Sequence, residues 1–241
     1  MSEFDENYFH TEAYAEVSFE KYSQYWWSNR FYALLARKHG PKRGRVLEVG
    51  CGLGHLMTFL TDRYEVYGGD INEHALQEAR RVAPEANIAA FSAEDLSMFP
   101  DAGFQIVICK HIVEHLPHPE KAIAEMGRVL APGGLLLLAT PNLDAPMHAR
   151  LGENWIGYKD PTHISMKTAT EWLKLIKGSR MQPRKVFTDG FWAPPYVDFL
   201  PLKLQKLIFG APGGIQAVMG WSVLPLSMGE SVIVLAEKLA T

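Results

Sequence analysis

The chain has 241 residues, of which 47% are hydrophobic, so it can bury the core of one large domain with an insertion or of two small ones. Its formal net charge of −3 offers no electrostatic footprint for a nucleic-acid backbone, and we expect no nucleic-acid partner. Two cysteines, Cys51 and Cys109, are too few for a disulfide framework and suit a reducing compartment. The acidic start of the chain lacks the apolar stretch of a signal peptide, and the sequence lacks a membrane-length apolar run. We therefore expect a cytoplasmic protein without a membrane span.

The first forty residues are rich in aromatic side chains. Between residues 25 and 38 the apolar positions recur at helical spacing, and Gly40-Pro41 ends the run. A helix that packs its aromatic stripe on a core explains this pattern, and so does a lid over a binding site. Since the two are compatible, we expect residues 1–42 to form an aromatic-rich helical lid.

The middle of the chain alternates between apolar strand-like runs and amphipathic helix-like runs. We predict strands at 45–49, 65–69, 87–91, 105–109, 134–140, 181–188 and 231–237, and helices at 55–63, 72–82, 119–130 and 168–177. Such alternation with short glycine-marked turns indicates a parallel sheet with helices on both faces. The predicted fold is α/β, a doubly wound, mostly parallel, seven-stranded sheet. It occupies residues 43–241, with a cap insertion at about 190–229.

The segment V-L-E-V-G-C-G-L-G joins the first strand to the next element. Glycines in such a turn let the backbone bend sharply and let a ligand approach where a Cβ would collide. Glu48 sits inside the strand, where a charge without partners is unfavourable, and Asp70 ends the second strand, where it could accept both hydroxyls of a ribose. The glycine spacing departs from the G-x-G-x-x-G of dinucleotide-binding proteins, because His55 stands where the third glycine would fall. An adenosine ligand is expected.

These residues resemble motifs of the class I S-adenosylmethionine-dependent methyltransferases. V-L-E-V-G-C-G-L-G looks like their first motif, and Asp70 falls at their ribose-binding motif. Residues 91–100 resemble the adenine-binding segment, residues 103–120 the fourth strand and its loop, and residues 127–142 the fifth strand with the helix and turn before it. The resemblance covers about residues 45–142. The closest subgroup in pattern is a small-molecule one that contains the ubiquinone O-methyltransferases.

The resemblance implies a site for S-adenosylmethionine and its product S-adenosylhomocysteine. The glycine turn would wrap the methionine part, Asp70 would hold the ribose, Ile71 would lie against the adenine face, and Lys110 and His111 would lie near the sulfonium. The residues expected at the cofactor are Glu48, Gly50, Cys51, Gly52, Gly54, Asp70, Ile71, Ser92, Ala93, Glu94, Lys110 and His111.

Two positions depart from the family pattern. Many relatives carry Asp where this chain has Ser92, so the adenine contact would rest on the backbone amide of Ala93. Gln105 replaces a common Asp in the fourth strand, and we expect this change to affect local structure rather than chemistry.

The residues His111, Glu114 and His115 form H-x-x-E-H. This spacing also occurs in a zinc-protease motif, but there the ligands lie on a helix, whereas this segment is expected to be a short loop. Ubiquinone O-methyltransferases carry E-x-x-E-H here and are associated with a divalent metal. The leading interpretation is a loop that orders the pocket, with no metal, and Glu114 and His115 remain the weaker metal candidates.

Methyl transfer needs a base only when the acceptor must lose a proton, as a hydroxyl must. His163, in the segment D-P-T-H-I, is our first candidate for such a base, and His111 is the second. A structural role for His163 competes with this interpretation. We expect Trp155 and Tyr158 to supply an aromatic wall for a planar or apolar acceptor.

The cap insertion is rich in Pro, Gly and aromatic residues, and it includes the amphipathic piece L-P-L-K-L-Q-K-L-I-F. We expect Trp192 and Tyr196 to roof the acceptor pocket. The amphipathic piece could be a cap packed on its own domain, a homodimer face, or a surface that associates weakly with a membrane.

The predicted function is transfer of a methyl group from S-adenosylmethionine to a small molecule, possibly apolar or lipid-like, at oxygen in the first instance. Two alternatives stay open. One is an oxidoreductase that uses a dinucleotide, and the other is a catalytically idle binding protein on the same scaffold. The motifs do not name the acceptor atom.

Overall fold

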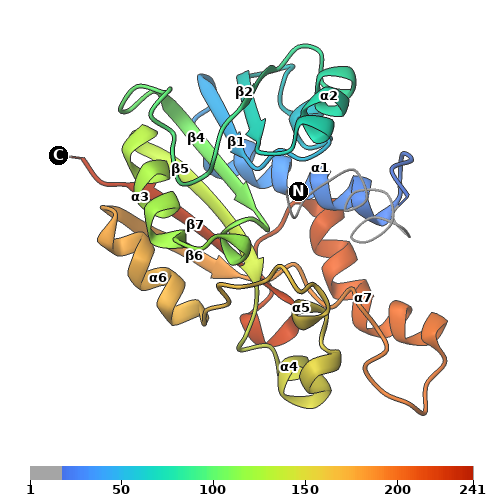
Figure 1. Ribbon diagram of the computed structural model, residues 1–241. Helices are drawn as coiled ribbons and strands as arrows, with labels where there is room; N and C mark the ends of the chain where they lie inside the picture. The colour runs from blue at the N-terminus through green and yellow to red at the C-terminus, as the bar shows by residue number, and fades with distance from the viewer. Residues whose placement is uncertain (1–17, 241) are drawn as a thin grey trace.

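A computed structural model describes residues 18–240 of the chain. Its centre is one seven-stranded sheet in the order β3-β2-β1-β4-β5-β7-β6 (Figure 1). Only β7 runs antiparallel to its neighbours, so the predicted doubly wound, mostly parallel sheet is confirmed. The strands are β1 (Arg45–Val49), β2 (Glu65–Asp70), β3 (Asn87–Ala90), β4 (Phe104–Lys110), β5 (Leu130–Pro141), β6 (Met181–Phe187) and β7 (Ser231–Lys238).

Two hydrophobic cores lie on the two faces of the sheet, because successive strand residues point to opposite sides. On one face Val46, Ile106 and Leu137 pack with helices α1 and α2, and on the other Leu47 and Val107 pack with α3 and α6. The central strands β1, β4, β5 and β7 are buried on both faces over most of their length, which explains their apolar runs, whereas the edge strands β3 and β6 are partly exposed. The helices are α1 (Gln24–His39), α2 (Glu73–Val82), α3 (Pro119–Val129), α4 (Pro146–Leu151), α5 (Ile156–Lys159), α6 (Ala169–Gly178) and α7 (Leu202–Met219).

Side-chain caps begin three of these helices where the sequence predicts their starts. The Ser23 hydroxyl accepts from the backbone N–H of Trp26, and the Asn72 side chain accepts from Ala75 N–H. Thr168 and Glu171 form a reciprocal capping box at α6. The predicted helix at the N-terminal segment is also present as α1, although residues 1–17 of the expected lid lie outside the described residues.

The prediction of a helix at residues 55–63 is wrong. This segment forms turns around a single 3-10 helix at Met57–Phe59. The Thr58 hydroxyl donates to the His55 carbonyl at 2.8 Å, and Arg37 donates to the Phe59 carbonyl, so both carbonyls are used outside an α-helical ladder. The glycine turn is therefore not followed by a helix whose first amides could face a ligand.

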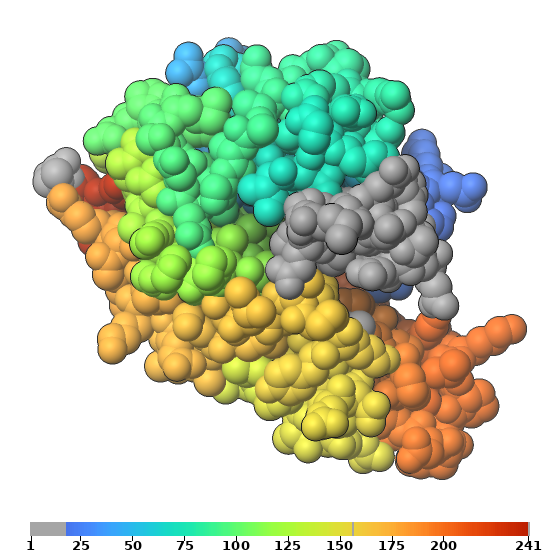
Figure 2. Space-filling model, in the orientation of Figure 1, coloured from blue at the N-terminus to red at the C-terminus, as the bar shows by residue number. Residues whose placement is uncertain are grey.

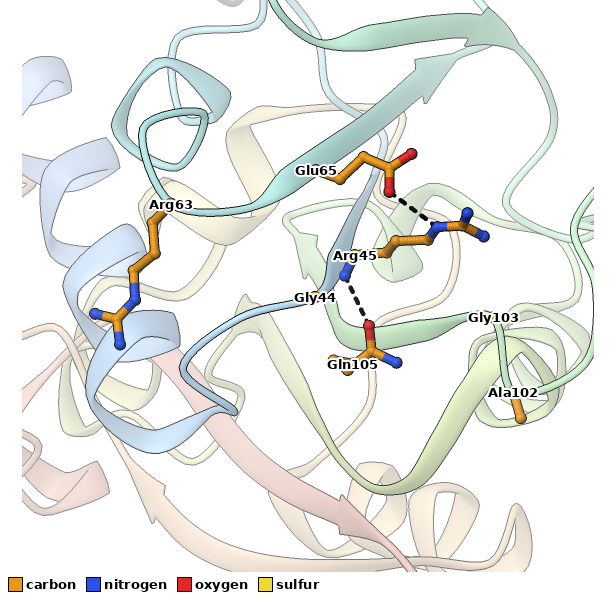
Figure 3. A pocket seen from close by; sticks show the side chains of 7 residues that line it. All are labelled: Gly44, Arg45, Arg63, Glu65, Ala102, Gly103 and Gln105. Carbon is orange, nitrogen blue, oxygen red and sulfur yellow. Dashed lines mark hydrogen bonds and ion pairs between the residues drawn. The ribbon is translucent and has the colours of Figure 1, made fainter.

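A shallow, open surface pocket of about 570 Å³ lies at the amino ends of β1, β2 and β4 (Figure 3). Here the Gln105 side-chain oxygen accepts from the backbone N–H of Arg45 at 2.7 Å, which joins the start of β1 to β4. A Cβ at Gly44 would lie only 2.2 Å from the same oxygen. The effect of Gln105 is therefore local and structural, as expected.

The segment between β6 and β7 carries α7, which packs beside α1, and a 3-10 helix at Leu226–Met228. The short amphipathic piece predicted here is the first half of an 18-residue helix that continues through Pro212. In Figure 1 this helix and the loops with α4 and α5 lie beyond the arrowheads of the parallel strands. No described helix has the length and apolarity that crossing a membrane requires.

Candidate functional site

A cavity of about 2170 Å³ opens at the carboxyl ends of the parallel strands. Its described walls come from the loops after β1 to β6, from the first half of α1 and from α7. Single small-ligand sites measure roughly 300–1,000 Å³, so this space can take a nucleoside-sized cofactor together with a second molecule. Ligands of doubly wound sheets bind at this edge, where the connection between strands reverses.

The glycine turn forms one wall of the cavity. Gly50 and Gly52 have φ angles of +74° and +48°, which L side chains rarely adopt. The N–H groups of Gly50 and Cys51 both donate to the Gly69 carbonyl at 2.9 Å, so the turn is tied to β2. Gly54 does not line the cavity, because its Cα faces α2 and a Cβ there would lie 2.9 Å from Ala79 Cα. Its expected cofactor contact is replaced by a packing role.

Asp70 closes this turn from the end of β2. One carboxylate oxygen accepts from Gly52 N–H and the other from Asn72 N–H, each at 3.0 Å. Burial raises the pKa of Asp70 above its usual range, and these backbone bonds oppose that rise. The side chain of the next residue, Ile71, is 62% exposed at the cavity rim. A fixed carboxylate beside an exposed apolar side chain suits a ribose with a base stacked next to it.

Glu48 and Lys110 form the floor of the cavity. Among the described residues Glu48 Oε2 has no hydrogen-bond partner, and burial raises the pKa of this carboxyl to about 8. Lys110 Nζ lies 3.1 Å from the side-chain oxygen of Asn29 in α1 and 5.0 Å from the centre of the Tyr32 ring. Burial lowers the pKa of Lys110 to about 8. Glu48 is an acid that lacks a hydrogen-bond donor among the described residues, and Lys110 is a base on the neighbouring strand. Such a pair matches a zwitterionic ligand, whose positive group can face the acid and whose negative group can face the base.

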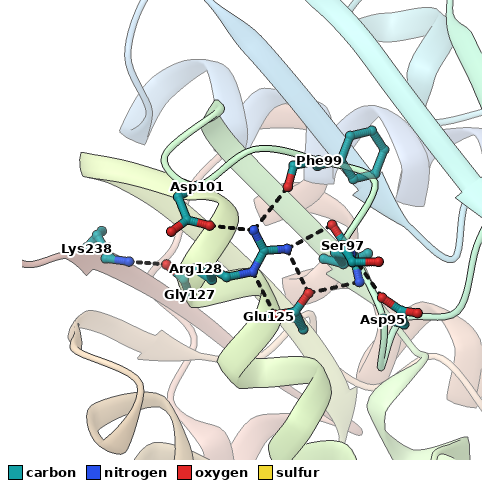
Figure 4. A network of polar contacts seen from close by, with 9 residues as sticks. Asp95, Ser97, Phe99, Asp101, Glu125, Gly127, Arg128 and Lys238 are labelled. Carbon is teal, nitrogen blue, oxygen red and sulfur yellow. Dashed lines mark hydrogen bonds and ion pairs between the residues drawn. The ribbon is translucent and has the colours of Figure 1, made fainter.

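Ser92, Ala93 and Glu94 line the cavity in the loop after β3. The Ser92 hydroxyl accepts from Glu94 N–H at 3.2 Å, and Glu94 accepts from His118 N–H at 2.8 Å. Arg128 of α3 holds the rest of this loop by donating to the carbonyls of residues 96 and 99 (Figure 4). The polar groups of this wall are therefore fixed before a ligand binds.

His111 leaves the end of β4 in a left-handed conformation, with φ +54°. Such a conformation is strained for a residue other than glycine and needs surrounding structure to hold it. The backbone N–H donates to the Ala139 carbonyl at 2.8 Å, and the ring Nδ1 lies 3.2 Å from Glu114 Oε1. These contacts hold the His111 side chain at the wall of the cavity.

His163 also lines the cavity and lies against His115, with ring centres 4.6 Å apart. The His163 Nδ1 is 2.5 Å from the Gly157 carbonyl, which can only accept. We therefore assign the proton to Nδ1, which leaves Nε2 as the basic nitrogen of the neutral ring. Asp160 Oδ2 lies 3.9 Å from this Nε2.

His115 is oriented by the same loop. Its Nδ1 lies 2.8 Å from the Thr162 hydroxyl, which donates to Asp160 at 2.5 Å. Burial lowers the pKa of His115, against the opposing effect of Glu114. From the sequence, the H-x-x-E-H and D-P-T-H segments were two separate candidate sites. In the structure their side chains lie together in one cluster.

Glu114, His115 and His163 offer ligand atoms that all lie within 4.8 Å of one another, a donor set that divalent transition metals accept. Glu114 is fully buried, and its Oε2 has no hydrogen-bond partner among the described residues. His163 takes the place that the H-x-x-E-H pattern gave to His111. The Nδ1 atoms of both histidines in the set already have protein partners, which accounts for the order of this loop without an ion.

The expected aromatic wall is corrected in part. Trp155 is fully buried and donates from its indole nitrogen to Glu230 at 2.6 Å, and Tyr158 packs on the rings of Trp155 and His148. Neither is among the described residues that line the cavity. Trp192 and Tyr196 do line it, with the Tyr196 hydroxyl accepting from Ala193 N–H at 2.7 Å.

Sequence reasoning missed Asp189 and Asn29. Asp189 is half-buried in the wall of the cavity, accepts from the Ser231 hydroxyl at 3.0 Å, and has a pKa raised by desolvation against the opposing charge of His111. Asp189 could have been predicted from the sequence, because it is an acidic residue two positions after the end of β6. Asn29 carried no signal, since only the packing of α1 brings it to Lys110.

This geometry defines a class of protein. A doubly wound sheet in the order 3-2-1-4-5-7-6 is the methyltransferase form of the Rossmann-like fold, and here it carries a glycine turn after β1 and an acid at the end of β2. A family model described as a methyltransferase domain matches residues 19–179. The chain belongs to this family, the class I S-adenosylmethionine-dependent methyltransferases.

The chain is similar to a phosphatidylethanolamine N-methyltransferase of Cereibacter sphaeroides, at 29% identity over 60% of this chain and 77% of that protein. It is 30% identical to a ubiquinone biosynthesis O-methyltransferase of Alkalilimnicola ehrlichii, over 59% of this chain and 58% of the relative. The chain thus spans little more than half of the second relative. The crystal structure of the YcgJ protein from Bacillus subtilis has the same fold, with a TM-score of 0.61 at 17% identity over 89% of this chain and all of that one.

Proposed function

We propose that the protein transfers the methyl group of S-adenosylmethionine to a small, largely apolar molecule, at an oxygen atom. The observation that carries this proposal is the single cavity with two different ends. Glu48 and Asp70 line it at the ends of β1 and β2, whereas His163 and the aromatic side chains of Trp192 and Tyr196 line it from the loops after β5 and β6, toward the other edge of the sheet. Methyl transfer requires the two reactants to lie in line in one water-poor space.

Glu48 and Lys110 would hold the amino-acid part of the cofactor. The Glu48 carboxylate would accept hydrogen bonds from the ammonium group, and Lys110 would face the carboxylate. A cation beside the positive sulfonium would oppose binding, so we place Lys110 at the carboxylate rather than at the sulfur. Asp70 would accept the ribose hydroxyls, and Ile71 and Ala93 would border the adenine.

Oxygen is favoured as the acceptor atom because His163 offers a base. A hydroxyl must lose a proton as its oxygen attacks the methyl carbon, and the Nε2 of neutral His163 is oriented to accept one. His111, between the two ends of the cavity, is the second candidate for this proton. Of the two curated relatives described above, one is named as an N-methyltransferase and the other as an O-methyltransferase, so the proposal of oxygen rests on His163.

The apolar character of the acceptor is supported by the walls at its end of the cavity. Phe191, Trp192, Pro194 and Tyr196 line this end together with small residues of α7. Such walls favour a ring or an acyl chain over a highly charged molecule. Both curated relatives described above carry names of lipid-soluble substrates, which agrees with this class.

Calorimetric titration of the protein with S-adenosylmethionine, S-adenosylhomocysteine and NADH tests the cofactor. We expect micromolar binding of the first two and none of NADH. Binding of NADH alone would instead indicate the dinucleotide oxidoreductase. If none binds, the catalytically idle scaffold is the better description. A screen with methyl-labelled cofactor and phenolic, carboxylic and amine acceptors would then identify the acceptor atom.

A further inference from the structure

Helix α7 is attached to the rest of the protein by polar side chains. The Gln205 carboxamide accepts from the N–H groups of Tyr196 and Val197 and donates to two carbonyls at 2.6 Å. Gln216 donates to the Thr188 carbonyl at 2.7 Å and accepts from two N–H groups of residues 223 and 224. The third buried residue is Gly213, where a Cβ would lie 2.5 Å from a backbone carbonyl.

The opposite face of α7 is apolar and exposed, the reverse of an ordinary surface helix. Leu207 is 66% exposed and Ile215 is 55% exposed. The exposed apolar side chains of the helix are Leu202, Leu204, Leu207, Ile208, Ile215, Val218 and Met219. The flanking residues Phe199, Trp221 and Val223 continue this surface at 81%, 40% and 66% exposure. Contiguous apolar surface of this kind marks a contact with a partner or a membrane.

The exposed charge around this surface is mostly positive. Residues 199–229 contain Lys203 and Lys206 and no acidic residue, with exposed Asp198 just before this segment and buried Glu230 just after it. Three cations from other elements contact the far end of the segment: Arg30 at the Val218 carbonyl, Lys38 at the Gly220 carbonyl and Lys185 at the Ser222 hydroxyl. The lysines within the segment are exposed, so the apolar face is bordered by positive charge. A basic border around leucines, valines and a tryptophan complements an anionic lipid surface.

The same helix lines the cavity. Lys206, Gly210, Gly214 and Ala217 contribute to its wall, while Leu207 and Ile215 do not. In the space-filling view this segment is a projecting corner of the molecule (Figure 2). A flat surface that this corner touches would therefore lie next to the acceptor end of the cavity.

We propose that the outer face of α7, with Phe199, Trp221 and Val223, binds the surface of an anionic lipid bilayer. The helix lies in the plane of the interface, with its leucines among the acyl chains and its lysines at the head groups. An amphipathic acceptor dissolved in the bilayer then reaches the cavity along α7. This supply role rests on the proposed function, whereas the binding itself does not.

Co-sedimentation of the full chain with phospholipid vesicles tests the proposal. We expect binding to vesicles of equal phosphatidylcholine and phosphatidylglycerol, and much weaker binding to phosphatidylcholine alone. The double variant Leu207→Asp, Ile215→Asp should lower the partition coefficient at least about tenfold, since it places charge in the apolar face. Lys203→Glu should weaken binding to anionic vesicles only. Leu239→Asp, at another exposed leucine, should bind as the unaltered protein does.

Absence of binding to anionic vesicles, or equal binding by the double variant, would overturn the proposal. A second copy of the chain is the competing occupant, so sedimentation velocity is measured in parallel. A dimer that the double variant converts to monomer, without vesicle binding, would assign the face to homodimerisation instead. Titration with S-adenosylhomocysteine checks that the variants are folded. Vesicle binding without cofactor binding would contradict the proposed function and leave this inference standing.

Discussion

Glu48 and Lys110 lie on the neighbouring strands β1 and β4 and form the floor of the cavity, and each stabilises the charged form of the other. Burial acts in the opposite direction on both, so that the pKa of the acid rises and the pKa of the base falls until each is about 8. The floor is therefore poised to change charge when a ligand supplies a further ion. Two measurements on cofactor-free protein follow from this arrangement.

The contribution of Glu48 to the stability of the cofactor-free protein should fall as pH rises between about 5 and 8. Glu48 titrates at 4.5 in the unfolded chain and at about 8 in the folded protein. In this window the folded state keeps the Glu48 proton that the unfolded state has lost, so the contribution of Glu48 to the free energy of unfolding decreases with pH, by up to a few kcal/mol. Urea unfolding across the window should show a shallower slope for Glu48→Gln. Parallel curves for the two proteins would contradict the assignment.

Above about pH 8 Lys110 acts in the other direction, because its pKa is 10.5 in the unfolded chain. There the unfolded state binds more protons, so the contribution of Lys110 to the free energy of unfolding grows with pH. Lys110→Met should remove this rise, and unfolding curves at alkaline pH measure it. An unchanged rise in the variant would assign it to another group.

Asp70→Ala should weaken cofactor binding by about 1–3 kcal/mol, because ribose hydroxyls would lose a buried charged acceptor. The substitution also releases the N–H groups of Gly52 and Asn72, so thermal unfolding must be recorded alongside. Titration with S-adenosylhomocysteine gives the affinity. Glu73→Ala, at the exposed start of α2, is the control and should leave it unchanged. Equal affinities of Asp70→Ala and the unaltered protein would remove Asp70 from the site.

His163→Ala should lower turnover more than cofactor affinity, because the ring serves the acceptor. Steady-state rates with an identified acceptor are compared with S-adenosylhomocysteine titrations on the same preparation. Thr162→Val, which disturbs the orientation of His115 but keeps His163, is the matched variant. An equal loss of turnover and affinity in His163→Ala would point to a structural role for this histidine.

Chelation should leave turnover unchanged, because His163 can take the proton of an acceptor hydroxyl without help from a metal. Activity is measured after dialysis against EDTA and after addition of Mg²⁺ or Zn²⁺. A loss that a metal restores would instead assign Glu114, His115 and His163 as its ligands.

Gln216→Ala should destabilise the protein more than Gln182→Ala. The first substitution leaves the Thr188 carbonyl and two N–H groups without their partner, at about 1–3 kcal/mol for each buried group, whereas Gln182 is exposed. Thermal unfolding of the two variants measures the difference. Similar transition temperatures would mean that α7 is held by other contacts.

The sequence predicted the centre of the sheet closely because β1, β4, β5 and β7 are buried on both faces, so their apolar runs are bounded by polar turns. The starts of α2 and α6 were predictable because Asn72 and Thr168 are caps, and caps act within one turn of the chain. The segment 55–63 has helical spacing, but its carbonyls are taken by a nearby hydroxyl and by Arg37 of α1. Only the second of these competitors is distant in sequence.

The cavity wall at the ends of β1 and β2 was predictable from the strands themselves, since Glu48 and Asp70 lie in the last two residues of these strands and Gly52 in the turn after β1. The walls formed by the loops after β5 and β6 were not. Trp155 seemed available to a ligand, yet its partner Glu230 lies 75 residues further along the chain. The contact between His115 and the loop of His163 likewise spans 47 residues, to Thr162. Periodicity and spacing carry no information about such pairs.

Strand β7 lies between β5 and β6 in the sheet, although it is the last strand to be made. Until residues 231–238 leave the ribosome, β5 and β6 have no common neighbour, and the long apolar edge of β5 stays open to water and to other chains. Stop codons ahead of Ser231 should therefore yield aggregating chains rather than a smaller working enzyme.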